Sequence, residues 1–213
     1  MNILVVAAHP DDEILGCGGT IARHVQDGDD VHVVILSEGI TSRGTREGVD
    51  ELIGAATKAH KLMGSIVNHY DFPDNRMDEI PLLDVVKVVE SAVQIVQPEI
   101  VYTHHGGDLN IDHRITHKAV MTVCRPLPGS TVKTVLCFEV PSSTEWGESF
   151  VPNWFVGIDL DKKIEALRVY DAEMREYPHP RSYLAVKYLA QWRGATAGVE
   201  AAEAFMLGRR ILC

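Results

Sequence analysis

Residues 1–13, MNILVVAAHPDDE, pass directly from an apolar run into a histidine, a proline and three consecutive carboxylates. The run ILVVAA at 3–8 is typical of a strand buried on both faces of a parallel sheet. Three adjacent acids repel one another unless a positive charge lies among them or water screens them. The stretch therefore predicts a central strand whose carboxyl end presents a charged loop, and a positive group is expected to lie within that loop.

Apolar runs and amphipathic stretches alternate along the first two thirds of the chain. Strands are expected at 3–8, 31–37, 66–70, 99–104 and 134–140, and helices at 13–26, 51–63, 82–96 and 112–124. This alternation predicts an α/β fold, Rossmann-like, with a mostly parallel sheet flanked by helices. The loops HPDDE (9–13) and HHGGDLNIDH (104–113) both follow strands, so they should share the sheet edge where such folds bind ligands.

The length of 213 residues suits one domain. Residues 1–140 are interpreted as the α/β core. Beyond residue 141 the pattern loosens: we expect a short strand at 155–160, a helix at 162–174 and a terminal helical region. Residues 141–213 are interpreted as a C-terminal elaboration that shapes the site.

Composition excludes several classes of protein. The net charge of −10 argues against a general nucleic-acid binder, which needs a surface that neutralises phosphates. No stretch approaches the roughly 18 apolar residues of a membrane helix, and the apolar start lacks the basic flank of a secretory signal. The four cysteines are scattered without a CxxC pair, which favours a reduced, cytoplasmic setting. Neither a nucleic-acid nor a membrane partner is therefore expected.

A candidate metal site combines the two loops. His9 and Asp12 are three residues apart at a strand-to-helix junction, and His113 lies on the second loop. Two imidazoles and one carboxylate are a ligand set typical of catalytic zinc. Asp11 then lies beside the ion without binding it, and Asp112 is expected to orient a histidine. The ligand set predicts Zn2+, although other divalent transition metals suit it too.

The motifs AHPDDE at 8–13, CGGT at 17–20 and DH at 112–113 resemble those of the LmbE-like (PIG-L) family of zinc-dependent N-deacetylases. Those proteins remove acetyl or similar acyl groups from the nitrogen of amino sugars. The resemblance runs from residue 1 to about residue 125. It implies that His9, Asp12 and His113 bind the metal and that Asp11 is the general base. It also implies a homo-oligomer, either a trimer or a hexamer.

One position departs from the family pattern. Many members carry HPDH in the second loop, whereas this chain has NIDH, with Asn110 in place of the first histidine. An amide can donate a hydrogen bond to an oxyanion but cannot deliver a proton. Asn110 and His179 are therefore the further catalytic candidates, with His179 in the restricted PHP turn as the general acid. Proton delivery by Asp11 itself, or by His104 or His105, stays open.

Five residues are expected to contact substrate, and each has a simpler interpretation. The arginines of the SRGTRE loop can grip a phosphate or sugar hydroxyls, or be ordinary exposed side chains. Because His104 and His105 are adjacent, at most one of them faces the site. HPDDE can also be a solvated turn that caps a helix, and His113 can pair with His117 one turn away. The expected substrate contacts are Arg43, Arg46, His105, Asp108 and Arg181.

Three functions fit these residues. The first is a metal-dependent hydrolase that removes an N-acetyl or other acyl group from an amino sugar or its conjugate, using metal-activated water with Asp11 as general base. The second is a non-catalytic sugar- or ligand-binding module that retains the metal pocket. The third is a metal-dependent hydrolase of a non-sugar amide. An intact Asp11 favours an enzyme, since a binding module has no chemical reason to keep a base. GCGGT is not a GxGxxG motif, which argues against a dinucleotide site.

Overall fold

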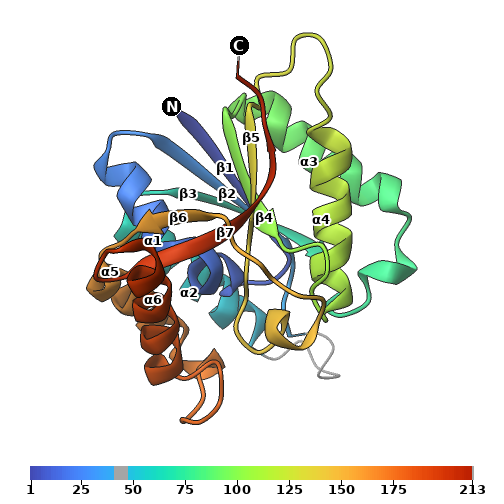
Figure 1. Cartoon of the computed structure of the whole chain (residues 1–213). Coiled ribbons are helices and arrows are strands. Elements are labelled where there is room, and N and C mark those ends of the chain that lie inside the picture. Colours follow the sequence, from blue (N-terminus) through green and yellow to red (C-terminus); the bar gives the residue numbers. More distant parts are fainter. Residues whose placement is uncertain (41–47, 213) are drawn as a thin grey trace.

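The computed structural model describes residues 1–40 and 48–212 (Figure 1). Within these residues the chain forms one seven-stranded sheet in the order β3-β2-β1-β4-β5-β7-β6. The strands are β1 (Asn2–Ala7), β2 (Asp30–Ser37), β3 (Ile66–Phe72), β4 (Ile100–His104), β5 (Thr134–Phe138), β6 (Trp154–Gly157) and β7 (Ala202–Arg210). The first five strands run parallel, and β7 pairs antiparallel with both β5 and β6. The predicted mostly parallel α/β fold is confirmed.

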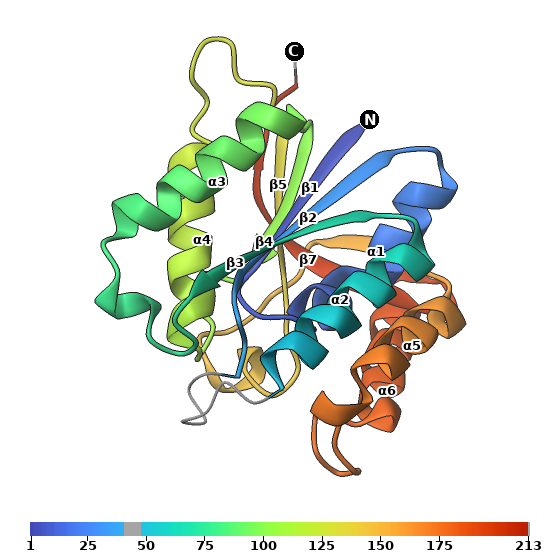
Figure 2. The same cartoon turned by 180° about the vertical axis from the view of Figure 1, so that it is seen from behind.

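Helices cover both faces of the sheet, as the two opposite views show (Figures 1 and 2). One face carries α1 (Asp12–Gln26), α2 (Val49–Met63), α5 (Leu160–Leu167) and α6 (Tyr183–Ala197). The other face carries α3 (Leu82–Val96) and α4 (Ile111–Val123). Short 3-10 turns complete the described elements: η2 (Met77–Glu79), η3 (Thr144–Trp146) and η4 (Arg168–Glu173). None of the described helices is long and apolar enough to cross a membrane.

Strand β1 lies in the middle of this sandwich, and its side chains alternate between two cores. Ile3 and Val5 pack with α1 and α2, whereas Leu4 and Val6 pack with α3 and α4. Successive side chains of a strand point to opposite faces. A continuous apolar run is therefore what a strand covered on both faces requires.

Glycines let α1 approach its neighbours closely. A Cβ atom on Gly16 would overlap the ring of Phe138 at the end of β5, and one on Gly19 would overlap Ile158. The glycines of the GCGGT stretch therefore serve packing beneath the loop that follows β1.

The C-terminal part differs from the sequence-based expectation in two places. The expected terminal helical region contains α6, but residues 202–210 form β7. The segment AEAFMLGRR is rich in good helix formers, yet β7 inserts between β5 and β6 and gains backbone pairing on both sides, which overrides propensity. The helix expected at 162–174 ends at Leu167 and continues as the 3-10 turn η4. Because β7 pairs with β5, the elaboration at 141–213 completes the same sheet.

Candidate metal centre and active site

Two loops meet at the carboxyl ends of β1 and β4, which are hydrogen-bonded neighbours in register Ile3↔Ile100. HPDDE follows β1 and leads into α1, and NIDH at 110–113 leads into α4. Parallel pairing brings the ends of adjacent strands to one edge, so residues about a hundred positions apart come into contact.

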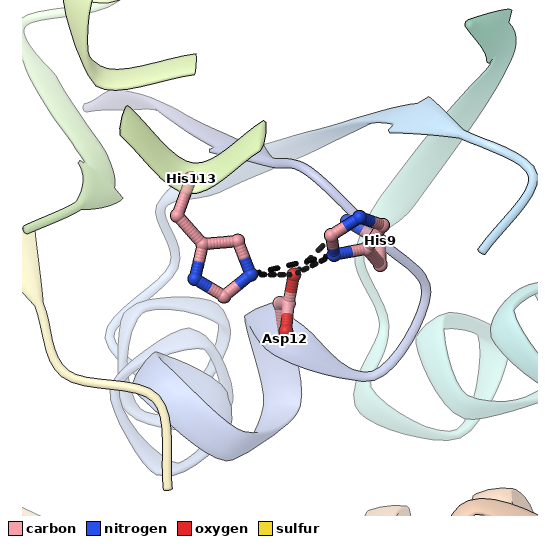
Figure 3. A group of neighbouring side chains, drawn as sticks. All are labelled: His9, Asp12 and His113. Atoms are coloured by element: carbon pink, nitrogen blue, oxygen red, sulfur yellow. Dashed lines mark hydrogen bonds and ion pairs between the residues drawn. The ribbon is translucent and has the colours of Figure 1, made fainter. Parts of the chain in front are cut away.

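Three ligand-type atoms converge where these loops meet (Figure 3). Oδ2 of Asp12 lies 3.0 Å from Nδ1 of His9 and 3.1 Å from Nε2 of His113, and the two ring nitrogens are 3.3 Å apart. All three residues are buried. Four ligands at the usual zinc distances of about 2.0–2.1 Å form a tetrahedron whose edges measure about 3.3–3.4 Å. The three atoms therefore fit one divalent cation, with a fourth position left open.

The other nitrogen of each imidazole is held by a carboxylate. Nε2 of His9 lies 3.0 Å from Oδ2 of Asp112, and Nδ1 of His113 lies 3.1 Å from Oδ1 of Asp108. Such carboxylate–histidine pairs fix the tautomer and the ring orientation of a metal ligand. Asp112 was expected to orient a histidine, and the structure places it against His9 rather than against the adjacent His113.

Both supporting carboxylates are themselves anchored. Asp112 accepts the backbone N–H groups of Asn75 and Met77 at 2.6 and 3.0 Å. Asp108 accepts the hydroxyls of Ser143 and Thr144. Asp108 was expected to contact substrate, but it is buried and fully engaged in these bonds, so it positions His113 instead.

A second buried group, formed by His9, Asp74 and Asp112, also brings three potential ligand atoms together. It uses the opposite ring nitrogen of His9, with Nε2 3.3 Å from Oδ1 of Asp74. Both oxygens of Asp112 already accept backbone hydrogen bonds. Asp12 accepts only one, from the N–H of His9 to Oδ2, and its buried Oδ1 accepts no hydrogen bond within the described residues. The first group is therefore the better metal site, and the second supports it.

The electrostatics of the cluster favour positive charge at the convergence point. Burial by itself lowers the pKa of His9, but hydrogen bonds to Asp112 and Asp12 outweigh it and raise that pKa to about 10. For Asp12 burial acts to raise the pKa, yet His113 and His9 hold it well below its usual range. A bound divalent cation would supply the positive charge that these carboxylates stabilise. Such a cation would offset the mutual repulsion expected among the three adjacent carboxylates of HPDDE.

Asp11 lines a cavity together with His9 and His113. Arg181 binds its carboxylate with two nitrogens, Nη1 3.1 Å from Oδ2 and Nη2 3.2 Å from Oδ1. The same Nη2 lies 3.5 Å from Oδ1 of Asp12. Burial raises the pKa of Asp11 to about 8, against the opposing effect of Arg181. Arg181 was expected to contact substrate; it lines the cavity and also links the two aspartates.

The cavity over the candidate metal centre has a volume of about 400 Å3. Its described lining is mostly polar and comes from segments spread between residues 9 and 181. Sequence reasoning missed Asp74 and Asn75, although the segment DFPDNR (71–76) leaves the carboxyl end of β3 and therefore lies at the same sheet edge. It also missed Glu173, which no local pattern marks, because only the packing of η4 brings it to the cavity. Residues that line the cavity include His9, Asp11, Asp74, Asn75, Asn110, His113, Ser143, Glu173 and Arg181.

Asn110 lines the cavity and begins α4. Its side-chain oxygen accepts the N–H of Asp112 at 2.8 Å, and its Nδ2 donates to Oδ1 of Asn75 at 2.9 Å. The residue is therefore a helix cap whose amide still has one N–H to offer.

Three of the histidines considered above lie away from the described cavity lining. His179 is exposed, its Nδ1 accepts the N–H of Arg181, and it is not among the described residues that line the cavity. His105 packs edge-on against Phe150 and is also absent from that described lining. His117, the alternative partner of His113, bonds the carbonyl of His104 through Nδ1 and is not part of a candidate metal group among the described residues.

His104 is the member of the adjacent pair that faces the metal centre. Its ring stacks on His113 with centroids 3.9 Å apart, and its Nε2 accepts the N–H of Ala8 while lying 3.7 Å from Asp12. Arg43 and Arg46 lie outside the described residues.

Residues 4–124 match the family model described as PIG-L: GlcNAc-PI de-N-acetylase. This chain belongs to the PIG-L family. It is 33% identical over 163 residues to the uncharacterized deacetylase YaiS of Escherichia coli strain K12, covering 74% of this chain and 82% of YaiS. A 127-residue stretch is 34% identical to 4-oxalmesaconate hydratase of Pseudomonas putida strain KT2440, covering 53% of this chain and 47% of the hydratase.

Similarity of fold to a solved structure extends over nearly the whole chain. The structure of N,N'-diacetylchitobiose deacetylase from Pyrococcus horikoshii superposes with a TM-score of 0.79 at 19% identity, covering 97% of this chain and 83% of that one. The C-terminal segment that carries Arg181 thus lies within the shared fold, although the family match itself ends at residue 124.

Proposed function

We propose that this protein is a metal-dependent N-deacetylase that hydrolyses the acetamide, or a similar amide, of an amino sugar or its conjugate. The observation that carries the proposal is the carboxylate of Asp11, free of metal-ligand duty and turned into a cavity beside three convergent ligand atoms. Amide hydrolysis needs an activated water, a group that accepts its proton and a donor for the departing amine.

His9, Asp12 and His113 would hold the cation, which we propose to be Zn2+. A divalent cation bound there would polarise the amide carbonyl group and make a bound water molecule more acidic. The chain supports this site by fixing both imidazoles with Asp112 and Asp108, so neither ring has to reorient when the ion enters.

Asp11 is proposed to take the proton of the attacking water and to return it to the amine nitrogen as the C–N bond breaks. The remaining N–H of Asn110 can donate to the oxygen that gains negative charge, since the side chain lines the cavity. The amide of Asn110 is not acidic enough to give up a proton to the departing amine. The position of His179 gives no support to that residue as the donor, so Asp11 serves in both transfers.

The substrate class is proposed from two kinds of support. The family description and the name of the Pyrococcus relative both concern N-acetylated sugars. The cavity offers carboxylates, amides and a guanidinium, groups that bind sugar hydroxyls through hydrogen bonds, and its volume of about 400 Å3 is in the range of small-ligand sites. Arg181 is the proposed contact within the described residues, and Arg43 and Arg46 remain proposed contacts.

The test is release of acetate from a panel of N-acetylglucosamine derivatives: the free sugar, a disaccharide, a nucleotide-linked sugar and an inositol conjugate. N-acetyl derivatives without a sugar are included. Purified protein is assayed as isolated, after chelation and after addition of Zn2+. Release that disappears with chelator and returns with Zn2+ supports the proposal. Activity confined to the non-sugar amides would change the substrate class, and inactivity of fully metal-loaded protein on the whole panel would favour a binding module.

Hydration of a carbon–carbon double bond is the second candidate function. It is favoured by the likeness to the Pseudomonas hydratase. A carboxylate that takes a proton from water beside a metal serves that reaction too. The same preparations should therefore be assayed with 4-oxalmesaconate, and turnover of that compound without acetate release on the panel would select the hydratase.

We also propose an oligomeric state and a cellular compartment for this protein. The family resemblance supports a homo-oligomer, a trimer or a hexamer, which sedimentation equilibrium tests directly. A cytoplasmic setting is supported by Cys17, Cys124 and Cys137, which are buried free thiols among the described residues.

A further inference from the structure

The proposed base, Asp11, occupies a backbone conformation that few non-glycine residues adopt. Its φ is +97° and its ψ is −30°, and its side chain makes no capping bond to α1. Positive φ brings the Cβ atom of an L-residue against its own backbone, so the conformation persists only where neighbouring groups hold it. What holds Asp11 decides where its carboxylate points.

Arg181 binds the Asp11 side chain, and the Asp11 carbonyl accepts the N–H groups of Ile14 and Leu15. The backbone N–H of Asp11 is held by the carboxylate of Glu13, the last residue of HPDDE. Its Oε2 accepts the backbone N–H of Asp11 at 3.0 Å. Glu13 is fully buried and is not among the described residues that line the cavity or form the candidate metal group. It therefore acts on the site only through Asp11.

The second oxygen of Glu13 is fixed from two other elements. Oε1 accepts the hydroxyl of Tyr170 in η4 at 2.8 Å and lies 3.2 Å from Nε2 of His60 in α2. A carboxylate oxygen only accepts, so Nε2 of His60 carries the hydrogen, and Nδ1 of the same ring lies 2.8 Å from the hydroxyl oxygen of Ser65. Both oxygens of Glu13 are therefore engaged, which restrains the orientation of its carboxylate.

We propose that Glu13 is a positioning residue that keeps the Asp11 carboxylate aimed at the reacting amide. The proposal rests on the proposed role of Asp11 as the base. Tyr170 and His60 extend the arrangement, so residues up to 157 positions apart determine the direction of one side chain. Residue 13 must present two acceptor oxygens, because Oε2 accepts the backbone N–H of Asp11 and Oε1 accepts from Tyr170 and His60.

The variant Glu13→Gln tests this requirement with almost no change in shape. Glutamine has one acceptor oxygen and one NH2 group, so either Asp11 or the Tyr170–His60 pair meets a donor instead of an acceptor. We expect kcat to fall about 10- to 100-fold, the range that follows a misplacement of about 1 Å, while KM and the bound metal stay at wild-type values.

Glu203→Gln is the matched control. Glu203 is also a buried glutamate that accepts backbone N–H groups of α1, those of Gly19 and Thr20, at the place where Cys17 departs from helical geometry. It pairs with Lys163 at 2.6 Å. Glu203→Gln disturbs a side-chain contact with the same helix, α1, one to two turns beyond Glu13. It should lower Tm while the kcat of the folded protein is unchanged.

A readout independent of turnover is the amide resonance of Asp11 in 15N-labelled protein. Glu13→Gln should move this resonance and speed its exchange with solvent, and Glu203→Gln should do neither. Should Glu13→Gln fail to fold, Tyr170→Phe removes one donor to the same carboxylate and should give a smaller loss of kcat in the same direction.

Wild-type kcat in folded Glu13→Gln, or equal losses of kcat in the two glutamate variants, would overturn the proposal. An unmoved Asp11 resonance in Glu13→Gln would overturn it as well. If the wild-type protein releases no acetate from any substrate, the proposed function fails, while the resonance still tells whether Glu13 holds Asp11.

Discussion

We name two groups of residues at the cavity the floor and the rim, and they are built in different ways. The floor is the candidate metal group His9, Asp12 and His113, of which His9 and His113 line the cavity and in which each imidazole is held by a buried carboxylate. It comes from two loops at the ends of two adjacent strands. The rim contains Asp11, Asn110, Glu173 and Arg181, contributed by the same loops and by two C-terminal segments. Its members are held by one another and by tertiary packing.

This difference predicts how each part responds to damage. A floor residue has one proposed function, ligation, and its replacement removes one of the three convergent ligand atoms. A rim residue combines chemistry with a structural duty, as Asn110 does by capping α4 and contacting the cavity. Floor substitutions should therefore remove the metal, and rim substitutions should separate rate from stability.

The largest effect is expected for His113→Ala. With one of three ligands gone, the purified variant should hold far less than one equivalent of metal, and its activity should match that of chelator-treated wild-type protein. Elemental analysis and the acetate assay measure both. His117→Ala, one turn further along α4, is the control and should keep the metal. A His113→Ala protein with full metal content would rule out the proposed ligand set.

Asp11→Asn should leave the floor intact and stop the chemistry. The amide cannot take a proton from water, so turnover should drop by about 10²–10⁴-fold, the contribution typical of a general base, with metal content unchanged. The measurement is kcat beside metal stoichiometry. Near-wild-type turnover in this variant would show that the base has been misassigned.

Asp108→Asn examines the support beneath the floor. The carboxylate of Asp108 lies 3.1 Å from Nδ1 of His113. Its replacement should weaken metal binding about 10–100-fold, as is typical when such a partner is removed. Competition against a chelating indicator gives the affinity. Asp71→Asn serves as the control, because Asp71 is an exposed residue of β3. An unchanged affinity in Asp108→Asn would mean that His113 keeps its orientation without this partner.

Two substitutions of Asn110 separate its capping role from its role in the cavity. Asn110→Ala removes the oxygen that accepts the N–H of Asp112, and should cost about 1 kcal/mol in the free energy of unfolding, measured in urea. Asn110→Ser keeps a capping oxygen but loses the amide N–H, so stability should be largely retained while kcat falls. If both variants keep wild-type kcat, the amide does not contact the reacting oxygen.

The smallest effect is expected for His179→Ala. The side chain is exposed and does not reach the described cavity lining, so kcat and its pH profile should stay at wild-type values. A loss of more than about tenfold would mark His179 as a proton donor after all, because general acids contribute at least about a hundredfold.

Much of the fold could be predicted because its signals are local. The apolar run of β1 and the alternation that follows it indicate a parallel sheet covered on both faces, and the structure confirms this. Residues 202–210 could not be recognised as β7, because their helix-forming composition is overridden by pairing with β5 and β6. That pairing depends on a strand more than sixty residues away.

The candidate site likewise contains residues that could be predicted from sequence and contacts that could not. His9, Asp12 and His113 could be proposed from sequence because their loops follow strands that end at one sheet edge. Asp112 could also be proposed as a residue that orients a histidine, but not which histidine it contacts. The contact of Asp108 with His113, the contact of Asp11 with Arg181 and the approach of Glu173 could not be proposed, since no local pattern marks them. The same holds for His104, whose ring turns inward against His113 while His105 turns toward Phe150.

The amino-acid sequence by itself determined the class of sheet, the two loops at its edge and the chemistry of the ligand atoms, because strand periodicity and side-chain type are local properties. Only the tertiary structure decided which carboxylate holds which imidazole, what keeps Asp11 in its unusual conformation and which C-terminal residues complete the cavity. Those contacts are fixed by the packing of elements far apart in the chain, where a displacement of one ångström exchanges one partner for another.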